Sequence, residues 1–381
     1  METLARARGA LYGLAIGDAL GMPTQMLSRG EIVRRWGRLV PGFEPAPPGH
    51  PIAANMPAGT VTDDTEQAVL LARLLVKGHG RINPHELAAA LVDWGRDMAE
   101  RGSLDLLGPS TKRAVAAIVA GVPPEEAGAA GTTNGAAMRI APVGIAVPLD
   151  PSSPLDPPSP LDPAPPPSQA SLSTLVDHVV TASRVTHNTG IALAGAAAVA
   201  AAVGAGVSGA TIAEATALGI EAAHIAAGRG HCVAGADVAA RIEWATGLVA
   251  GRAGAEAAEL IYTLAGTSLA TQESVPAAFA VLAAVPEDPW RAARLAAARG
   301  GDCDTIAAKA GAIAGACYGA GSFPSEAIAV IDAQGLGLAA LAGELLALRD
   351  RPGDRDRPGD RDRPGDRDRP GDRDRPGSQA R

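Results

Sequence analysis

The chain has 381 residues, of which 47% are hydrophobic and only 3% aromatic, and its formal net charge is −8. A core of Ala, Val, Leu and Ile with few aromatic residues is typical of many closely packed helices, because Ala and Leu favour helix over strand. The acidic balance argues against a nucleic-acid partner, and three cysteines without a CxxC spacing argue for a reducing compartment and against a thiolate metal site.

The first 21 residues hold a short apolar run that is spaced by Gly13, Gly17 and Gly21. Asp18 interrupts this run, so it does not match a signal peptide, and no segment reaches the roughly 20 unbroken apolar residues of a membrane span. We therefore expect a cytoplasmic, monomeric protein with no membrane partner. Glycines at i, i+4 and i+8 form a smooth helical stripe, where the backbone of another helix can approach closely.

Helical periodicity continues through most of the chain, with breaks at Gly, Pro and Asn. We find no run of alternating β-branched residues with hairpin turns. The sequence therefore predicts an all-α fold, a compact multi-helix bundle in a single domain over residues 1–346. The clearest predicted helices cover residues 66–77, 85–100, 111–120, 189–204, 235–250 and 305–319.

An acidic cluster opens the first of these helices, where residues 60–66 read Thr-Val-Thr-Asp-Asp-Thr-Glu. Hydroxyl and carboxylate oxygens suit hard cations such as Mg²⁺, Mn²⁺ or Ca²⁺ rather than zinc. The alternative interpretation is a helix cap, since Asp63 and Glu66 have the spacing of a capping signature. A cap needs only one such residue, however, and adjacent carboxylates repel each other unless a cation lies between them.

A proline-rich segment at 148–169 repeats Pro-Leu-Asp and predicts a stiff, exposed, disordered insertion at about 147–171. Helical sequence flanks it on both sides, so we interpret it as a long surface loop, although a linker between two domains fits as well. At the C-terminus, the last 33 residues repeat RPGDRD, a unit that offers no apolar side chain to bury, which predicts a disordered tail over residues 347–381. The last 33 residues carry a net charge of +2, which leaves the rest of the chain at −10.

A second acidic cluster opens a helix near the C-terminus, where residues 300–306 read Gly-Gly-Asp-Cys-Asp-Thr-Ile. Two clusters of oxygen ligands at helix starts can clamp a pair of ions roughly 3.5–4 Å apart. We therefore predict a site for two divalent cations. Gly311, Gly315 and Gly319 repeat the N-terminal glycine spacing and favour close packing of the helices that hold the site, although packing without functional meaning explains the glycines equally well.

At these residues the chain resembles the ADP-ribosylglycohydrolase family, which includes the dinitrogenase reductase-activating glycohydrolases. The matching segments, in order, are GLAIGDALGMP (13–23), GTVTDDTEQA (59–68), GTTNGAAMRIAPVG (131–144), SRVTHNTG (183–190), ESVPAA (273–278) and GGDCDTIAAKAGAIAGA (300–316). The resemblance implies an all-α fold of that family, and removal of ADP-ribose from a modified protein side chain, with an arginine-type N-glycosidic bond favoured. It also implies two bound Mg²⁺ or Mn²⁺ ions whose ligands are Thr62, Asp63, Asp64, Asp302, Asp304 and Thr305.

The resemblance further assigns residues to catalysis and to substrate binding. The candidate catalytic carboxylates are Asp304, Asp64 and Asp105, the last of which aligns with a family aspartate across a one-residue gap. The candidate substrate-binding residues are Gln25, Asn134, Gly135, Met138, Arg139 and His187. A lone histidine is as often a structural residue as a ligand, so both interpretations of His187 stay open. We expect Asp18 to support the site from behind.

Gln25 departs from the family pattern, in which many members carry a glutamate four residues after GDALG. An amide hydrogen-bonds a substrate or water but does not accept a proton at neutral pH. Either an aspartate of the metal cluster or Asp105 then acts as the base, or the substrate differs, or the protein is weakly active or inactive. The rival hypotheses are therefore a hydrolase of small ribosyl or nucleoside conjugates and a catalytically idle ADP-ribose-binding protein.

Overall fold

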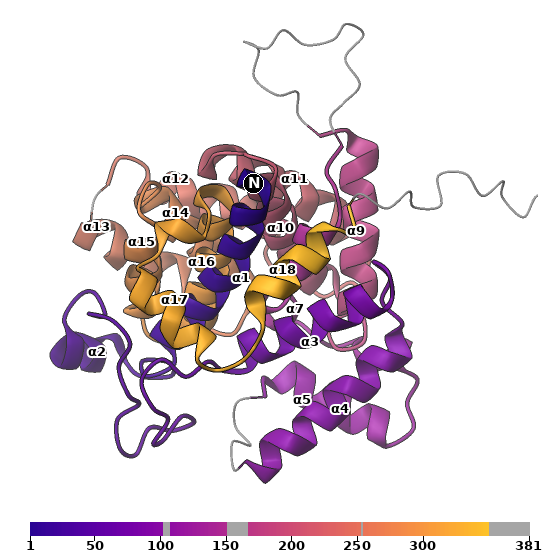
Figure 1. Cartoon of the computed structure of the whole chain (residues 1–381), viewed down its shortest axis with the longest axis horizontal. Coiled ribbons are helices and arrows are strands. Elements are labelled where there is room, and N and C mark those ends of the chain that lie inside the picture. The colour runs from indigo at the N-terminus through magenta and orange to yellow at the C-terminus, as the bar shows by residue number, and fades with distance from the viewer. Residues whose placement is uncertain (102–106, 151–166, 253, 350–381) are drawn as a thin grey trace, which may run out of the picture. The chain divides into compact units, whose positions relative to one another are not determined.

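The computed structural model describes residues 1–101, 107–150, 167–252 and 254–349, and it confirms the all-α fold (Figure 1). Within these ranges β pairing is limited to two isolated bridges, Thr133 with Ala270 and Thr189 with His231. The part of the chain up to Arg349 forms one compact unit. Most of the proline-rich insertion predicted at about 147–171, and nearly all of the tail predicted at 347–381, lie outside the described residues.

All six of the most clearly predicted helices are present, and their ends lie within three residues of the predicted ones. They are α3 (Asp63–Lys77), α4 (Pro84–Glu100), α5 (Pro109–Val119), α10 (Gly190–Val207), α12 (Val238–Val249) and α16 (Cys303–Tyr318). The other longer helices are α1 (Glu2–Gly21), α2 (Arg29–Trp36), α9 (Gln169–Ser183), α11 (Ile212–Ala227), α14 (Thr271–Ala284), α15 (Pro289–Ala297), α17 (Ser325–Asp332) and α18 (Leu338–Leu346). Shorter elements are α6 (Pro124–Ala127), α7 (Gly135–Met138), α8 (Ala141–Ala146), α13 (Gly254–Leu260), the π-helix η2 (Ile261–Ala265) and the 3₁₀ turn η3 (Ala320–Ser322).

Local sequence signals explain where several helices begin. Helix α4 follows Asn83, whose side chain accepts a backbone hydrogen bond, and Pro84 occupies the first turn, where its missing N–H costs nothing. Helix α11 begins with a capping box, in which Thr211 and Glu214 each accept a hydrogen bond from the other's backbone N–H. These helix starts follow from short-range chemistry, without help from the rest of the fold.

Helix α10 lies inside the core, packed against α11, α16, α8 and α9. It is long and apolar enough to cross a membrane by length and composition, but all of its residues are buried within the protein. A helix that is apolar on every side is expected where other helices surround it. Helix α10 therefore has the surroundings of a core helix.

Helices α1 and α16 pack against each other in opposite directions through their glycines, and Figure 1 shows them side by side. A Cβ atom on Gly13 would lie 2.0 Å from the carbonyl oxygen of Gly311, so the two backbones leave no room for a side chain. The predicted glycine packing is thereby confirmed. Two details differ from the spacing argument, since Gly9 faces Gly315 and Gly319 ends α16 at φ 82° instead of extending the stripe.

The same helix contact reaches the second acidic cluster. A Cβ atom on Gly21, the last residue of α1, would lie 2.1 Å from the Cα atom of Asp304. Backbone contact at this end of α1 therefore sets the position of the carboxylates at the start of α16. Because α1 also carries Asp18, one helix is in contact with both acidic clusters.

Candidate functional site

The two acidic clusters, 241 residues apart in sequence, meet at the starts of α3 and α16. The hydroxyl of Thr305 donates a hydrogen bond of 3.2 Å to Oδ2 of Asp64, which joins one cluster to the other. The four aspartates of the clusters are all buried, and none is more than 7% exposed: Asp63, Asp64, Asp302 and Asp304. The structure therefore brings together the six residues predicted as metal ligands.

The carboxylates are not engaged as helix caps. Thr62 and Asp302 stand at the N-cap positions of α3 and α16, and neither side chain makes a capping hydrogen bond. Glu66, which a capping box requires to turn back, instead accepts hydrogen bonds from Nε1 of Trp94 (2.7 Å) and from the guanidinium of Arg101. The capping-box alternative is therefore wrong, because the glutamate is used to hold α4 against α3.

Asp18, on α1, holds the start of α3 in place. Its carboxylate accepts hydrogen bonds from the backbone N–H and the hydroxyl of both Thr62 and Thr65, over 2.5–3.1 Å. Burial raises the pKa of Asp18 to about 6, and these four hydrogen bonds oppose the rise. Asp18 thus supports the cluster from behind, as expected.

Negative charge is crowded in this cluster. Burial raises the pKa values of Asp63, Asp64 and Asp304 well above their usual range, and repulsion from neighbouring carboxylates raises them further. Oδ1 of Asp64 and Oδ1 of Asp304 are buried without a hydrogen-bond partner in the part of the chain that is described. Carboxylates in such surroundings need a proton or a cation to compensate their charge.

Asn134 orients one of these carboxylates. Its Nδ2 donates to Oδ2 of Asp302 at 2.5 Å and to Oγ of Ser274 at 2.8 Å. Burial raises the pKa of Asp302, while the charge of Lys309 and the hydrogen bond from Asn134 lower it. The loop residue predicted to bind substrate thus also anchors a predicted metal ligand.

Lys309 is a site residue that the sequence reasoning missed. It is fully buried on α16, and its Nζ has no hydrogen-bond partner among the residues that the structure describes. Burial lowers its pKa to about 8, against the opposing charges of Asp302, Asp64 and Asp304. The available signal was its position, because Lys309 is the only charged residue of α16 after Asp304. Its ammonium group offsets part of the negative charge of the cluster.

A cavity of about 190 Å³ opens on the acidic cluster. Eight of the predicted site residues line it: Gln25, Asp63, Asn134, Gly135, Met138, Asp302, Asp304 and Thr305. Other lining residues, which the sequence did not reveal, come from the first turn of α5, the segment before it and separate loop positions, and include Met26, Ile52, Leu107, Thr111, Lys112 and Leu269. Their residue types carry no chemical signal, so only the fold identifies them.

Gln25 lies on the turn that follows α1, where its backbone N–H donates to the carbonyl of Gly21. The side chain is buried and lines the cavity, and its Nε2 has no partner among the described residues. An amide with an unpartnered N–H at the cavity wall can donate to a hydroxyl of a substrate or to water. The position that departs from the family pattern therefore borders the cavity.

Arg139 and His187, also predicted to bind substrate, do not line this cavity. Arg139 is fully buried and donates to Oε1 of Gln67 and to the hydroxyl of Thr186. The ring of His187 lies between the hydroxyls of Thr133 and Thr186 and packs directly behind Gly135. Both side chains support the cavity wall from its inner side.

Two of the predicted metal ligands also lie away from the cavity lining. Thr62 and Asp64 sit deeper, where Asp18 and Thr305 contact them. Asp105, the third candidate catalytic carboxylate, falls outside the described residues. Of the candidate catalytic residues, Asp304 alone is therefore placed at the cavity by the described part of the chain.

The donor set suits a hydrated hard cation. In the described ranges, no three Asp, Glu, His or Cys side chains converge closely enough to hold one ion unaided. Mg²⁺ usually keeps several waters and binds through one or two carboxylates, so it does not require such a cage. The unpartnered oxygens of Asp64 and Asp304, together with nearby threonine hydroxyls, fit that kind of coordination.

Comparison with known proteins identifies the family and the fold of the chain. The model of the ADP-ribosylglycohydrolase family matches residues 1–355. The uncharacterised protein YegU of Escherichia coli (strain K12) is 33% identical over 329 residues, which cover 86% of this chain and 92% of YegU. The ADP-ribosyl-[dinitrogen reductase] glycohydrolase of Rhodospirillum rubrum is 30% identical over 150 residues, or 37% of this chain and 44% of that protein.

A solved structure described as an ADP-ribosylglycohydrolase-related protein complex superposes with a TM-score of 0.62 at 25% identity, covering 91% of this chain and 99% of its own. The resemblance seen in the sequence motifs is thereby confirmed, and family and fold together indicate a hydrolase of ADP-ribose conjugates. The chain belongs to the ADP-ribosylglycohydrolase family, whose members are glycosidases.

Proposed function

We propose that this protein is a divalent-cation-dependent hydrolase that removes ADP-ribose from a modified protein side chain, with an arginine-type N-glycosidic bond as the favoured substrate. One observation carries the proposal: two buried acidic helix starts converge beside a single cavity, and carboxylate oxygens of Asp64 and Asp304 have no partners among the described residues. The name of the Rhodospirillum rubrum relative describes an ADP-ribosylated protein as its substrate, which supports a protein conjugate here.

The proposed cations are two Mg²⁺ or Mn²⁺ ions. The residues that would hold them are Thr62, Asp63, Asp64, Asp302, Asp304 and Thr305. Bound there, the ions would polarise and orient the ribose hydroxyls beside the scissile bond. The chain's own contribution is the rigid placement of these oxygens, through Asp18 behind α3 and Asn134 beside Asp302.

Asp304 is the favoured general base. Cleavage of a ribosyl bond develops oxocarbenium character and requires a carboxylate to activate the attacking water. Asp304 borders the cavity, has an unpartnered oxygen and has a raised pKa, whereas Asp64 lies deeper and accepts from Thr305. Gln25 is placed to donate a hydrogen bond to the substrate or to water, but not to take the proton.

A hydrolase of small ribosyl or nucleoside conjugates is the second candidate function. The cavity of about 190 Å³ is smaller than the roughly 300–1,000 Å³ of pockets that enclose drug-sized ligands. It accommodates a ribose and its immediate neighbours, so a small conjugate fits without further contacts. Gln25, in place of the family glutamate, also favours a change of substrate.

The test is to incubate the full-length protein with ADP-ribosyl-arginine, ADP-ribosyl-serine and free nucleosides, each with Mg²⁺, Mn²⁺ or EDTA. The first proposal predicts cation-dependent release of ADP-ribose, fastest from the arginine conjugate. Faster cleavage of nucleosides supports the second candidate instead. Binding of ADP-ribose with no release from any substrate contradicts both and indicates an idle binding protein.

A further inference from the structure

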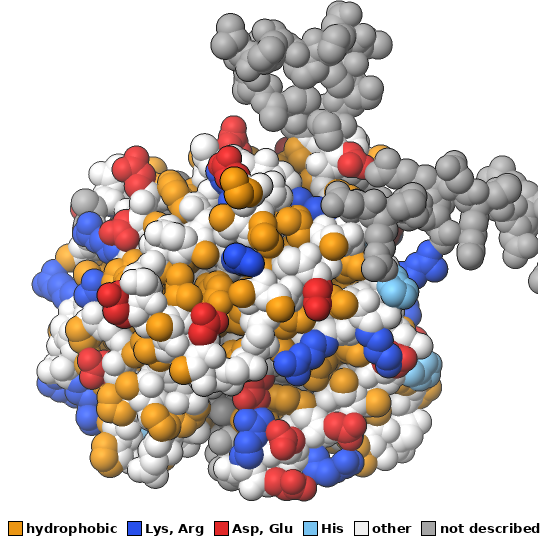
Figure 2. Space-filling view, viewed as in Figure 1, with side chains coloured by type: hydrophobic (Ala, Val, Ile, Leu, Met, Phe, Trp, Pro, Cys, Tyr) orange, Lys and Arg blue, Asp and Glu red, His pale blue; other side chains and the backbone are white. Residues whose placement is uncertain are grey.

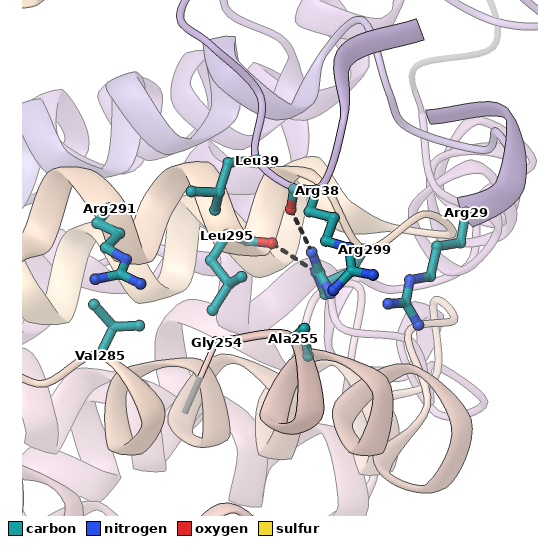
Figure 3. A pocket seen from close by; sticks show the side chains of 10 residues that line it. Arg29, Arg38, Leu39, Gly254, Ala255, Val285, Arg291, Leu295 and Arg299 are labelled. Atoms are coloured by element: carbon teal, nitrogen blue, oxygen red, sulfur yellow. Dashed lines mark hydrogen bonds between the residues drawn. The ribbon is translucent and has the colours of Figure 1, made fainter. Parts of the chain in front are cut away.

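A second cavity, of about 180 Å³, shares no lining residue with the cavity at the acidic cluster. Four arginines border it, from α2, the segment after α2, and the α15 region: Arg29, Arg38, Arg291 and Arg299. Figure 3 shows these side chains together with Leu39, Val285 and Leu295, which contribute an aliphatic wall. The cavity thus combines concentrated positive charge with an apolar lining.

Arg299 is buried at the bottom of this arrangement, with 1% of its surface exposed. Its Nε donates to the carbonyl of Leu295 at 2.7 Å and its Nη2 to the carbonyl of Arg38 at 2.9 Å, as the dashed lines in Figure 3 show. Its Nη1 is buried with no hydrogen-bond partner in the described part of the chain. A buried guanidinium N–H without an acceptor destabilises the folded protein, because it has lost its hydrogen bond to water and no protein group replaces it.

The carboxylates nearby offset only part of this charge. Glu259 pairs with Arg29, and Glu256 pairs with Arg252, which is not part of the cavity wall. Within the described residues, no carboxylate forms an ion pair with Arg38, Arg291 or Arg299. Burial and the charge of Arg29 lower the pKa of Arg299 to about 10, as expected where cations crowd together.

Basic side chains are visible along the edge of the molecule that carries α2 and α13 in Figure 2. The chain without its last 33 residues has a net charge of −10, so a cavity bordered by four arginines contrasts with the overall charge. A cavity with one sign of charge and an apolar wall attracts a counter-ion, since little solvent is present to screen the interaction.

We propose that this arginine cavity binds a phosphate group. Guanidinium groups match the oxygens of phosphate in paired hydrogen bonds, and Arg299, which borders the cavity, has an Nη1 without a hydrogen-bond partner among the described residues. The volume corresponds to roughly six water molecules at about 30 Å³ each, which accommodates one such group. Three arginines that form no ion pair with a described residue favour a dianion over a single carboxylate.

Phosphate binding at this cavity can be tested independently of the proposed hydrolase activity. Inorganic phosphate is titrated into the full-length protein by calorimetry in the presence of EDTA, so that phosphate cannot bind through a cation at the acidic cluster. Ionic strength is held constant with chloride. We expect one phosphate to bind per chain, and the double variant Arg38→Ala/Arg291→Ala to weaken its binding at least about tenfold.

Arg34→Ala is the matched control, because Arg34 is an exposed residue of α2 that does not line the cavity. Both Arg38 and Arg291 are exposed as well, so the double variant is expected to fold, which circular dichroism checks. Absence of saturable phosphate binding overturns the proposal. Equal phosphate affinity in the double variant and in Arg34→Ala overturns it too.

Discussion

Lys309 and the carboxylates around it set the electrostatic balance of the site. One ammonium group lies among several buried carboxylates without forming an ion pair or a hydrogen bond to any of them in the described structure. The ammonium group therefore acts on the carboxylates through its electrostatic field, which is strong where water is excluded. The motif around it pointed to Asp302, Asp304 and Thr305, but a single lysine in a helix has no motif, so its role became visible only in the fold.

Lys309→Met is expected to tighten the binding of Mg²⁺ or Mn²⁺ at least about tenfold, because it removes a positive charge that repels a second cation. Isothermal titration calorimetry measures the affinity. Lys77→Met serves as the control, since Lys77 is an exposed residue whose partner is Glu86. Unchanged or weaker cation binding in Lys309→Met is incompatible with this role for the lysine.

At the scale of helices, hydrophobic periodicity and capping residues predicted the main elements. They did not predict the register in which one helix packs against another. The glycine spacing of α1 and α16 showed that each helix offers a smooth stripe, but not which glycine faces which. Register depends on where α1 ends against Asp304 and where Gly319 ends α16. These contacts connect distant parts of the chain, and no local pattern encodes them.

Gly13→Ala is expected to destabilise the protein by about 3 kcal/mol, because the new Cβ meets the backbone of Gly311 and forces α1 away from α16. The same displacement moves the second acidic cluster, so cation binding weakens as well. Chemical denaturation followed by circular dichroism measures the loss.

Gly343→Ala in α18 is the matched control, because its Cβ would have only ordinary contact with Leu4. That replacement should be neutral or stabilise the protein by up to about 1 kcal/mol, as expected for glycine to alanine within a helix. Equal stabilities of the two variants contradict the close packing of α1 and α16.

At the scale of the whole molecule, the ordered motifs predicted the family and six residues that converge at the acidic cluster. Which side chains reach the cavity was harder to predict. Arg139 and His187 turn inward because Gln67, Thr133 and Thr186 offer them hydrogen bonds from other elements. The arginine cavity gave no signal in sequence, since its residues come from segments more than 250 positions apart.

The pH dependence of stability should reflect His187. Burial, together with Arg139 and Arg113, lowers its pKa well below the ordinary value of 6.5, so the folded protein holds it neutral. The unfolded chain takes up a proton below that pH. The contribution of neutral His187 to the free energy of unfolding is therefore present above pH 6.5. It is lost as the pH falls below that value, by up to about 1.4 kcal/mol per pH unit.

We expect His187→Gln to lose less stability than the wild-type protein between about pH 7 and pH 5. Urea unfolding at each pH measures the difference, and His224→Gln, at an exposed position, should retain the wild-type dependence. If His187→Gln and the wild type lose equal stability over this range, another group dominates.

The hydrolysis rate of wild type and Asp304→Asn, each with saturating Mg²⁺ or with EDTA, tests the central claim most directly. Asp93→Asn, at an exposed position on α4, is the control. The account predicts that EDTA abolishes release of ADP-ribose and that Asp304→Asn slows it at least about 100-fold, as loss of a general base does. Release by Asp304→Asn at the wild-type rate, or release unaffected by EDTA, would contradict it.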